Sequence, residues 1–144
     1  MKTLFDPLSP TSCVSFRLRR AARVVAKSYD AALKPAGLRN TQFTLLAVLV
    51  MEGSQNIGQL SQALATDGTT LTRNLDVLVK RGLVEAAGNH EDERVRMVQA
   101  SQAGEKLYRD ALPLWQTAQR HMLDVVGESR WQEMAGLLQL VETE

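Results

Sequence analysis

The apolar residues of this chain change their spacing twice, and this change limits the folds that the chain can form. From about residue 12 to residue 82 they recur every three or four positions, which is the repeat of amphipathic helices. In LVEAAGNHEDERVRMVQAS, which starts at Leu83, they flank a polar stretch and nearly alternate, as in two short antiparallel strands joined by a long loop. Helical spacing then returns up to Val141. The sequence therefore predicts helices on both sides of one β-hairpin.

Four helices are expected before the hairpin and two after it. Asn56, followed by Gln59, forms a capping-box pattern at the start of the third helix, and Ser101 caps the fifth. Glycines and Pro35 mark the ends of several others. The predicted fold is mainly α, an α+β winged helix, in the order four helices, two strands and two helices. The helices are expected over residues 12–33, 40–52, 57–64, 68–81, 102–125 and 129–141.

The third and fourth predicted helices, with the tight turn between them, form a helix-turn-helix, and the hairpin just after them is a wing. The first and last helices are not needed for that module. Their apolar stripes are larger than a winged core of roughly 60 residues can cover. These stripes are therefore expected to bury each other, in the same chain or against a second one.

The fourth helix carries threonines through its first turns, in ATDGTTLTRNLDVLVKRGLVE, residues 65–85. Each threonine is less favourable in a helix than alanine by about 0.5 kcal/mol, and capping explains only Thr66 and Asp67 well. Leu71, Leu75 and Leu78 form the side expected to be buried. Thr69, Thr70, Arg73 and Asn74 lie largely on the other side, and Thr72 falls with them early in the helix.

This polar side suits the DNA major groove, which the second helix of a helix-turn-helix enters by its N-terminus. Threonine offers a hydroxyl for a base edge or a phosphate and a methyl for the thymine methyl group. Arg73 can reach a phosphate or make a bidentate contact to guanine. The helix N-terminus itself favours a phosphate. We therefore interpret the polar side of this helix as a DNA-reading surface.

The polar tip of the hairpin, NHEDERVR, is the second candidate site. Asp92 stands two residues before Arg94, where a carboxylate can brace a guanidinium. An arginine held at a wing tip suits the narrow, electronegative minor groove. Arg96 would support Arg94 or contact the DNA backbone. The alternative interpretation is a charged, solvated loop.

The sequence contains none of the common enzyme signatures. His90 and His121 are far apart, and there is no HExxH, cysteine cluster, GxSxG, P-loop or GxGxxG motif. No enzyme activity, catalytic residue, metal site or cofactor is therefore expected.

One cysteine, Cys13, rules out an internal disulfide, which fits a reducing cytoplasm. The start of the chain holds Asp6 and two prolines where a secretion signal needs an apolar stretch, and no apolar run is long enough to span a membrane. A cytoplasmic protein is expected.

Positive charge is concentrated near the start of the chain. Residues 1–41 hold eight Lys and Arg against two Asp, although the whole chain has a net charge of only +1. This segment could face phosphate, an anionic ligand or acidic neighbours in the fold, or it could be a solvated helix face.

The order of elements and three stretches of the chain resemble the MarR family of bacterial winged-helix transcriptional regulators. TTLTRNLDVLVKRGLVE is similar to the recognition helix of the family, DERVRMVQAS to its wing, and LKPAGLRNTQFTLLAVL to the junction of its first two helices. The resemblance runs from about Cys13 to the C-terminus. By position, Thr69, Thr70, Thr72 and Arg73 match the recognition residues, and Asp92 with Arg94 match the wing pair. Glu93 replaces a second wing arginine that many members carry.

The resemblance implies an obligate homodimer that binds a palindromic operator, usually as a repressor. Residues 1–36 and 101–144 would form a helical dimerisation region, and residues 37–100 the winged helix-turn-helix DNA-binding region. Such proteins are mostly released from DNA by small aromatic or phenolic ligands, or by cysteine oxidation. The implied partners are double-stranded operator DNA, a second copy of the chain and a small aromatic or anionic effector.

Two features bear on the signal that the protein would sense. Arg17, Arg20 and Tyr29 are candidates for binding an anionic aromatic ligand, from their charge and ring. Cys13 lies near the position of a reactive thiol in a peroxide-sensing branch of the family, about two residues early, so a thiol-based redox regulator is an alternative. A third hypothesis is a winged-helix protein-interaction module without DNA reading, which the acidic Glu91 and Glu93 favour.

Overall fold

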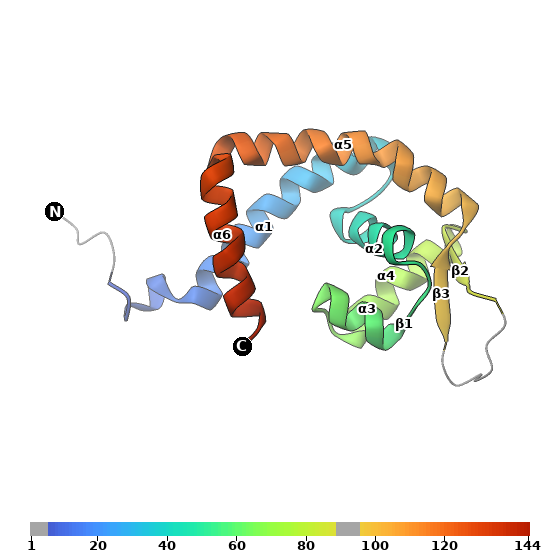
Figure 1. Ribbon diagram of the computed structural model, residues 1–144, viewed down its shortest axis with the longest axis horizontal. Coiled ribbons are helices and arrows are strands. Elements are labelled where there is room, and N and C mark those ends of the chain that lie inside the picture. The colour runs from blue at the N-terminus through green and yellow to red at the C-terminus, as the bar shows by residue number, and fades with distance from the viewer. Residues whose placement is uncertain (1–5, 89–95) are drawn as a thin grey trace.

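Figure 1 shows the computed structural model, which describes residues 6–88 and 96–144. The predicted order of helices and strands is confirmed, with one further strand before the third helix. The first half holds η1 (Pro10–Ser12), α1 (Val14–Leu33), η2 (Lys34–Ala36), α2 (Asn40–Glu52), β1 (Gln55–Asn56), α3 (Ile57–Leu64) and α4 (Gly68–Lys80). The second half holds β2 (Val84–Ala86), β3 (Met97–Ala100), α5 (Gln102–Val126) and α6 (Glu128–Glu142).

The long helix α5 spans the top of the molecule in Figure 1, with α1 packed along it. Helices α2, α3 and α4 and the strands lie beneath one end of α5. At the other end the chain turns at Gly127 into α6, which runs downward from α5 and crosses α1 in this view. The chain therefore forms a winged-helix part and an arm of terminal helices, and α5 belongs to both.

Helix α2 is the centre of the winged-helix part, because it contacts α1, α3, α4, α5 and β3. Its helical spacing predicts an inner side of Phe43, Leu46, Ala47 and Val50. Phe43 and Leu46 are buried, Ala47 and Val50 are half-buried, and Leu45 and Leu49, which are outside that set, are buried too. A helix surrounded by other elements needs apolar residues all round. The core around it is mostly aliphatic, and its most completely buried side chains are Leu33, Leu45, Leu46, Leu60, Leu71, Leu78 and Val98.

The three strands form one antiparallel sheet in the order β1-β3-β2. The predicted hairpin is confirmed by the pairing of β2 with β3, in which Glu85 lies opposite Gln99. Strand β1 was not predicted, because its two residues are too few to show an alternating pattern. Asn56 belongs to this strand and also caps α3, and the predicted capping box with Gln59 is confirmed by bonds of 2.8 and 2.9 Å.

Helix α4 begins directly after Asp67, whose carboxylate is the N-cap. One carboxylate oxygen accepts the backbone N–H of Thr70 at 2.8 Å, and the other accepts the Thr70 hydroxyl at 3.0 Å. These hydrogen bonds hold the pKa of the Asp67 carboxyl below its usual value, so the cap is ionised at neutral pH. Leu71, Leu75 and Leu78 are buried as predicted.

The start of α5 is clamped to the turn between α4 and β2. Ser101 caps α5 as predicted: its hydroxyl oxygen accepts the N–H of Gly104 at 3.1 Å and its hydroxyl donates to the Gly82 carbonyl at 2.6 Å. A Cβ placed on Gly104 would lie 2.0 Å from the carbonyl oxygen of Leu83, which is backbone and cannot swing aside. Only glycine fits at residue 104 with the chain in this position.

A row of aromatic rings connects the winged-helix part to the terminal helices. Phe43 of α2 stacks on Tyr108 and Trp115 of α5, with ring centroids 5.5 and 5.9 Å apart. Trp115 in turn lies 6.3 Å from Tyr29 of α1. Offset ring pairs at these distances add packing energy beyond the area that they bury. The row ends at Tyr29, whose hydroxyl donates to the side-chain oxygen of Gln119.

The arm of terminal helices exposes large apolar side chains in the single chain. The apolar stripe predicted for α1 is covered at Tyr29, but Leu18 and Ala22 near its start are exposed. Large apolar patches on a soluble protein often mark an interaction site. The exposed large apolar residues of the arm are Val14, Phe16, Leu18 and Val24 of α1, Val125 of α5, and Met134, Leu137, Leu140 and Val141 of α6.

Gly104→Ala is expected to destabilise the fold by about 3 kcal/mol, because the new methyl overlaps a backbone carbonyl that must then move. Gly68→Ala is the matched control, since residue 68 is an exposed glycine at the start of α4 with open space around it. That change should be neutral or stabilise by up to about 1 kcal/mol. Urea unfolding of both variants at one protein concentration measures the difference. Equal midpoints would contradict the close contact at Gly104.

Candidate nucleic-acid interface

The outer side of α4 carries three of the predicted DNA-contacting residues together. Thr69, Thr72 and Arg73 are all exposed, and they border a shallow hollow with Ile57 at the start of α3 and with Asp76. The Thr72 hydroxyl donates to the Gly68 carbonyl at 2.7 Å, which leaves acceptor capacity on the hydroxyl oxygen. This side offers a guanidinium, a carboxylate, methyl groups and hydroxyl oxygens to a partner.

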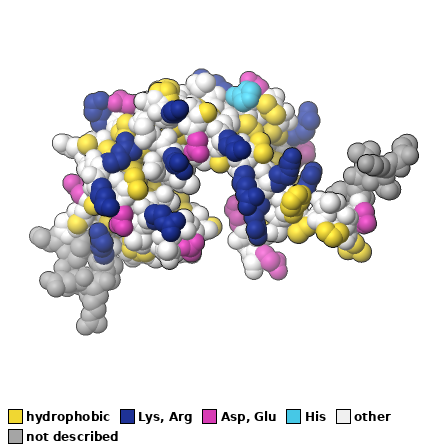
Figure 2. Space-filling view, turned by 180° about the vertical axis from the view of Figure 1, so that it is seen from behind, with side chains coloured by type: hydrophobic (Ala, Val, Ile, Leu, Met, Phe, Trp, Pro, Cys, Tyr) yellow, Lys and Arg dark blue, Asp and Glu magenta, His cyan; other side chains and the backbone are white. Residues whose placement is uncertain are grey.

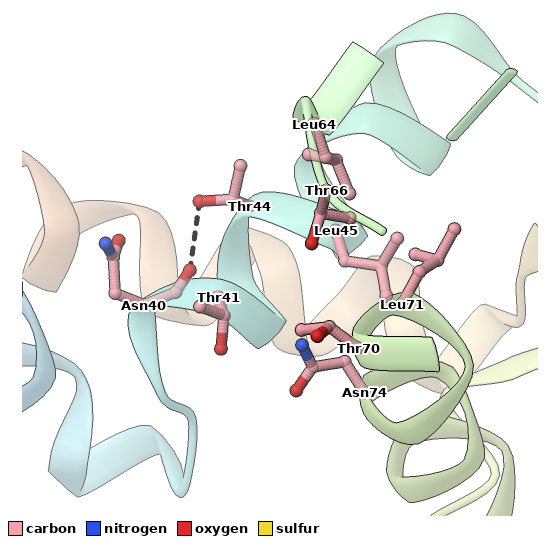
Figure 3. A pocket seen from close by; sticks show the side chains of 9 residues that line it. All are labelled: Asn40, Thr41, Thr44, Leu45, Leu64, Thr66, Thr70, Leu71 and Asn74. Atoms are coloured by element: carbon pink, nitrogen blue, oxygen red, sulfur yellow. Dashed lines mark hydrogen bonds between the residues drawn. The ribbon is translucent and has the colours of Figure 1, made fainter. Parts of the chain in front are cut away.

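The other two predicted residues of α4 lie on a different side of the helix. Thr70 and Asn74 line a hollow of about 190 Å³ between α4 and the beginning of α2 (Figure 3). Thr41 projects into the same space from α2, facing Asn74 and Thr70. The five predicted residues therefore form two neighbouring groups rather than one.

The structure gives Thr70 a second role that the sequence interpretation assigned only to Thr66 and Asp67. Its hydroxyl and its backbone N–H both bind the Asp67 carboxylate, so Thr70 completes the helix cap. The cap also changes the expectation for a phosphate at this helix end. The ionised Asp67 already satisfies the Thr70 amide there, which disfavours a second anion at the same position.

Sequence reasoning missed the start of α2 as part of this surface. Asn40 and Thr41 lie about thirty residues before α4 in the chain but beside it in space. The Asp30 carboxylate of α1 accepts the backbone N–H of Asn40 at 2.7 Å and so fixes where α2 begins. The only local signal was an Asn-Thr pair at a helix start, which does not reveal its neighbours.

The wing can be described at its base. Arg96 is exposed just before β3, and the side chains of Gln99 and Glu85 bond across the two strands at 3.1 Å. Asp92 and Arg94 lie outside the described residues, so their paired arrangement stays a prediction.

The candidates in α1 do not come together. Tyr29 is buried against α5, while Arg20 lines a surface hollow with Cys13, Arg19 and Arg23. Arg17 is exposed on the same helix. Cys13 is exposed at the start of α1.

Basic side chains gather on the arm that carries the start of α1 and on the winged-helix part, as the dark blue atoms in Figure 2 show. Acidic side chains are interspersed on both. Within residues 6–88 and 96–144, no three His, Cys, Asp or Glu residues cluster so as to hold a metal ion. Over the same residues, no helix is both long and apolar enough to cross a membrane.

Comparison with known proteins identifies the family. A sequence model of the MarR family matches residues 36–95. The transcriptional regulator MosR of M. tuberculosis, solved in complex with DNA, is 34% identical, with a TM-score of 0.78 over 91% of this chain and 97% of MosR.

Two curated bacterial regulators are also similar. The transcriptional repressor MprA of Escherichia coli is 34% identical over 83 residues, which are 56% of this chain and 47% of MprA. The HTH-type transcriptional regulator YhbI of Bacillus subtilis is 26% identical over 107 residues, which are 74% of this chain and 66% of YhbI. The matched part is thus about half to two-thirds of these relatives, and the MosR match covers nearly the whole of both chains. The chain belongs to the MarR family of winged helix-turn-helix transcriptional regulators.

Proposed function

We propose that this protein is a homodimeric, sequence-specific DNA-binding repressor that binds a palindromic operator and responds to a small molecule. The observation that carries the proposal is the arrangement of α4. Its leucines are buried, and Thr69, Thr72 and Arg73 stand exposed on one side of its first two turns. Hydroxyls, methyls and a guanidinium at the leading end of a helix suit base edges and phosphates in the major groove.

The start of α2 extends this surface. Thr41 lies next to Thr70 and Asn74, so a DNA backbone that runs past α4 would also meet the first turn of α2 (Figure 3). The wing would then reach the neighbouring minor groove, with Arg96 exposed at its base and Arg94 as the residue predicted from the sequence for its tip. The DNA-binding region in this proposal is residues 37–100.

A second copy of the chain accounts for the exposed apolar surface of the arm. Residues 1–36 and 101–144 form the dimerisation region in this proposal. Leu137 and Leu140 of α6 are 63% and 68% exposed, and Phe16 of α1 is 52% exposed. Burying such side chains yields about 25 cal/mol for each Å² removed from water. A two-fold dimer presents two copies of α4 in opposite directions, which is why its operator would be palindromic.

Repression is proposed from the relatives. MprA is named a transcriptional repressor, and MosR has been solved in complex with DNA. A repressor is useful only if a signal releases it, and a ligand that binds one state of the dimer better than the other can supply that signal. Among the described residues, no contact favours the protein-interaction or Cys13 redox alternatives over this proposal.

Arg73→Ala should weaken binding to the promoter region of the protein's own gene by about 1–3 kcal/mol, the value of a good base or phosphate contact. Lys80→Ala removes the same charge from the last turn of the same helix and should have a much smaller effect. Gel-shift titrations at several salt concentrations measure both, and wild-type affinity should fall steeply with salt. If both variants lost the same DNA affinity, the proposed contact of Arg73 with a base or phosphate would be contradicted. Thr70 is unsuitable for this test because its replacement also damages the cap of α4.

Arg94→Ala tests the wing. Its affinity for the same DNA should fall by about 1–3 kcal/mol if the guanidinium enters the minor groove. Asp92→Ala should produce part of the same loss, because the unbraced guanidinium is less ordered. Unchanged affinity in Arg94→Ala would leave the wing as a solvated loop.

Leu137→Glu with Leu140→Glu tests the dimer. Two charges on the exposed apolar side of α6 should convert the protein to monomers, because each would be buried without a partner in the dimer. Met51→Glu is the control: Met51 is 72% exposed, but it lies at the end of α2, away from the arm. Light scattering after size-exclusion chromatography gives the mass, and circular dichroism confirms that the monomer is folded. A double variant that remains dimeric would place the interface elsewhere.

A further inference from the structure

The first turn of α2, which lies beside α4 on the proposed DNA-binding surface, is capped from another helix. Its own N-cap residue is Arg39, and a guanidinium carries only donors, so it cannot accept from the free amides of a helix start. The acceptor is the Asp30 carboxylate of α1, which takes the backbone N–H of Asn40 at 2.7 Å. An anion is favoured at this end of a helix. Asp30 is thus a remote cap for α2.

A second bond holds the connection between α1 and α2 from the side of α4. The Arg81 guanidinium, directly after the last residue of α4, donates to the Gly37 carbonyl at 2.8 Å. The two groups are close, because a Cβ on Gly37 would lie 3.3 Å from the same guanidinium. Leu38, next in the chain, is 3% exposed and belongs to the core. The segment from Gly37 to Asn40 is therefore fastened both to α1 and to α4.

These bonds set the position of the side chains of α2 that face α4. The Asn40 carbonyl accepts the Thr44 hydroxyl at 2.9 Å, so both backbone groups of Asn40 are held (Figure 3). Asn40 and Thr41 line one hollow with Thr70 and Asn74 of α4. A shift in the start of α2 would therefore change the spacing between Thr41 and the α4 residues beside the proposed path of the DNA.

Neither Asp30 nor Arg81 is placed to bind DNA itself. Asp30 is half-buried and acidic, and a carboxylate repels phosphates. Arg81 lies beyond the C-terminal end of α4, about 18 Å along the helix from Thr69 at a rise of about 1.5 Å per residue. Thr69 is at the end of α4 that would enter the groove. An effect of either residue on DNA binding would therefore act through the position of α2.

We propose that Asp30 and Arg81 are positioning residues for DNA binding, which hold the first turn of α2 against α4 so that both helices contact one operator together. This role rests on the proposed function. It also connects the DNA-binding surface to the arm, because Asp30 follows Tyr29, where α1 packs on α5. A change in the position of α1 within the dimer is thereby transmitted to the first turn of α2.

Asp30→Ala in the full-length protein separates position from charge in gel-shift titrations with the same promoter DNA. Removing a negative charge from a DNA-binding protein reduces repulsion and by itself strengthens binding. Losing the cap should instead weaken specific binding roughly three- to thirtyfold, the equilibrium effect of one helix cap. Asp124→Ala is the matched control, since it removes the same group from an exposed position on α5 and should not weaken binding. Asp30→Asn keeps an oxygen that can accept from Asn40, so it should retain most of the affinity.

Arg81→Ala is tested by the salt dependence of binding. A lost phosphate contact lowers the slope of log affinity against log salt by about 0.9 for each contact. Losing the bond to Gly37 should instead weaken specific binding roughly three- to tenfold, the effect of one hydrogen bond, with the slope unchanged. Lys80→Ala is the control, because it removes a positive charge from the neighbouring residue and leaves the bond to Gly37 in place.

Hydrogen exchange without DNA tests the remote cap independently of the proposed function. In Asp30→Ala the Asn40 amide should exchange roughly tenfold faster or more, because its opening no longer breaks a hydrogen bond, while amides in the middle of α5 keep the wild-type rate. Light scattering should give the same mass for the variant and the wild type. Should Asp30→Ala misfold by circular dichroism, the salt slope of Arg81→Ala and the affinity of Asp30→Asn still decide the matter.

Four results would overturn the proposal. Asp30→Ala that binds DNA as tightly as wild type, or more tightly, would mean that the start of α2 needs no support from α1. Asp30→Asn as weak as Asp30→Ala would refute the hydrogen bond as the cause. A lower salt slope in Arg81→Ala would make Arg81 a phosphate contact, and unchanged exchange at Asn40 would refute the cap. Each of these leaves the DNA-binding function intact. If the wild type binds no DNA specifically, that function fails, and exchange at Asn40 still decides whether Asp30 holds α2.

Discussion

The burial of three leucines of α4 against the rest of the winged-helix part sets the orientation of the proposed DNA-reading surface. Leu71, Leu75 and Leu78 are almost completely removed from water. Rotating α4 about its own axis would expose them, at about 1.5–3 kcal/mol for each side chain. Thr69 and Arg73 are therefore held outward by contacts on the opposite side of the helix, and they need no contacts of their own to be in place.

The helices could be predicted closely from the sequence because each shows several turns of one repeat and most carry a recognisable end, such as Asn56 or Ser101. Strand β1 could not be predicted, because its two residues are too few to show the alternation of apolar and polar side chains that marks a strand. The burial of Leu45 could not be predicted from the sequence either. It follows from the position of α2 at the centre of the packing and not from the spacing of apolar residues within α2.

The candidate site was predictable in its residue types and less so in its grouping. Arg20 and Tyr29 are nine residues apart, about two and a half helical turns, so helix geometry alone already separates their sides. The capping role of Thr70, the nearness of Thr41 to α4 and the bond from Asn40 to Asp30 all depend on tertiary packing. No local pattern encodes such contacts between residues distant in the chain.

The close approach of Gly104 to Leu83 holds the start of α5 in place, so any tilt of this helix displaces its other end. The helix has 25 residues and is therefore about 37 Å long, so a tilt of about 5° at the fixed end moves its far end by about 3 Å. The turn that holds the fixed end lies between α4 and β2, and the far end joins α6. In the proposed dimer, slight repacking around α6 would thus alter the distance between the two DNA-reading helices while each winged-helix part kept its internal structure.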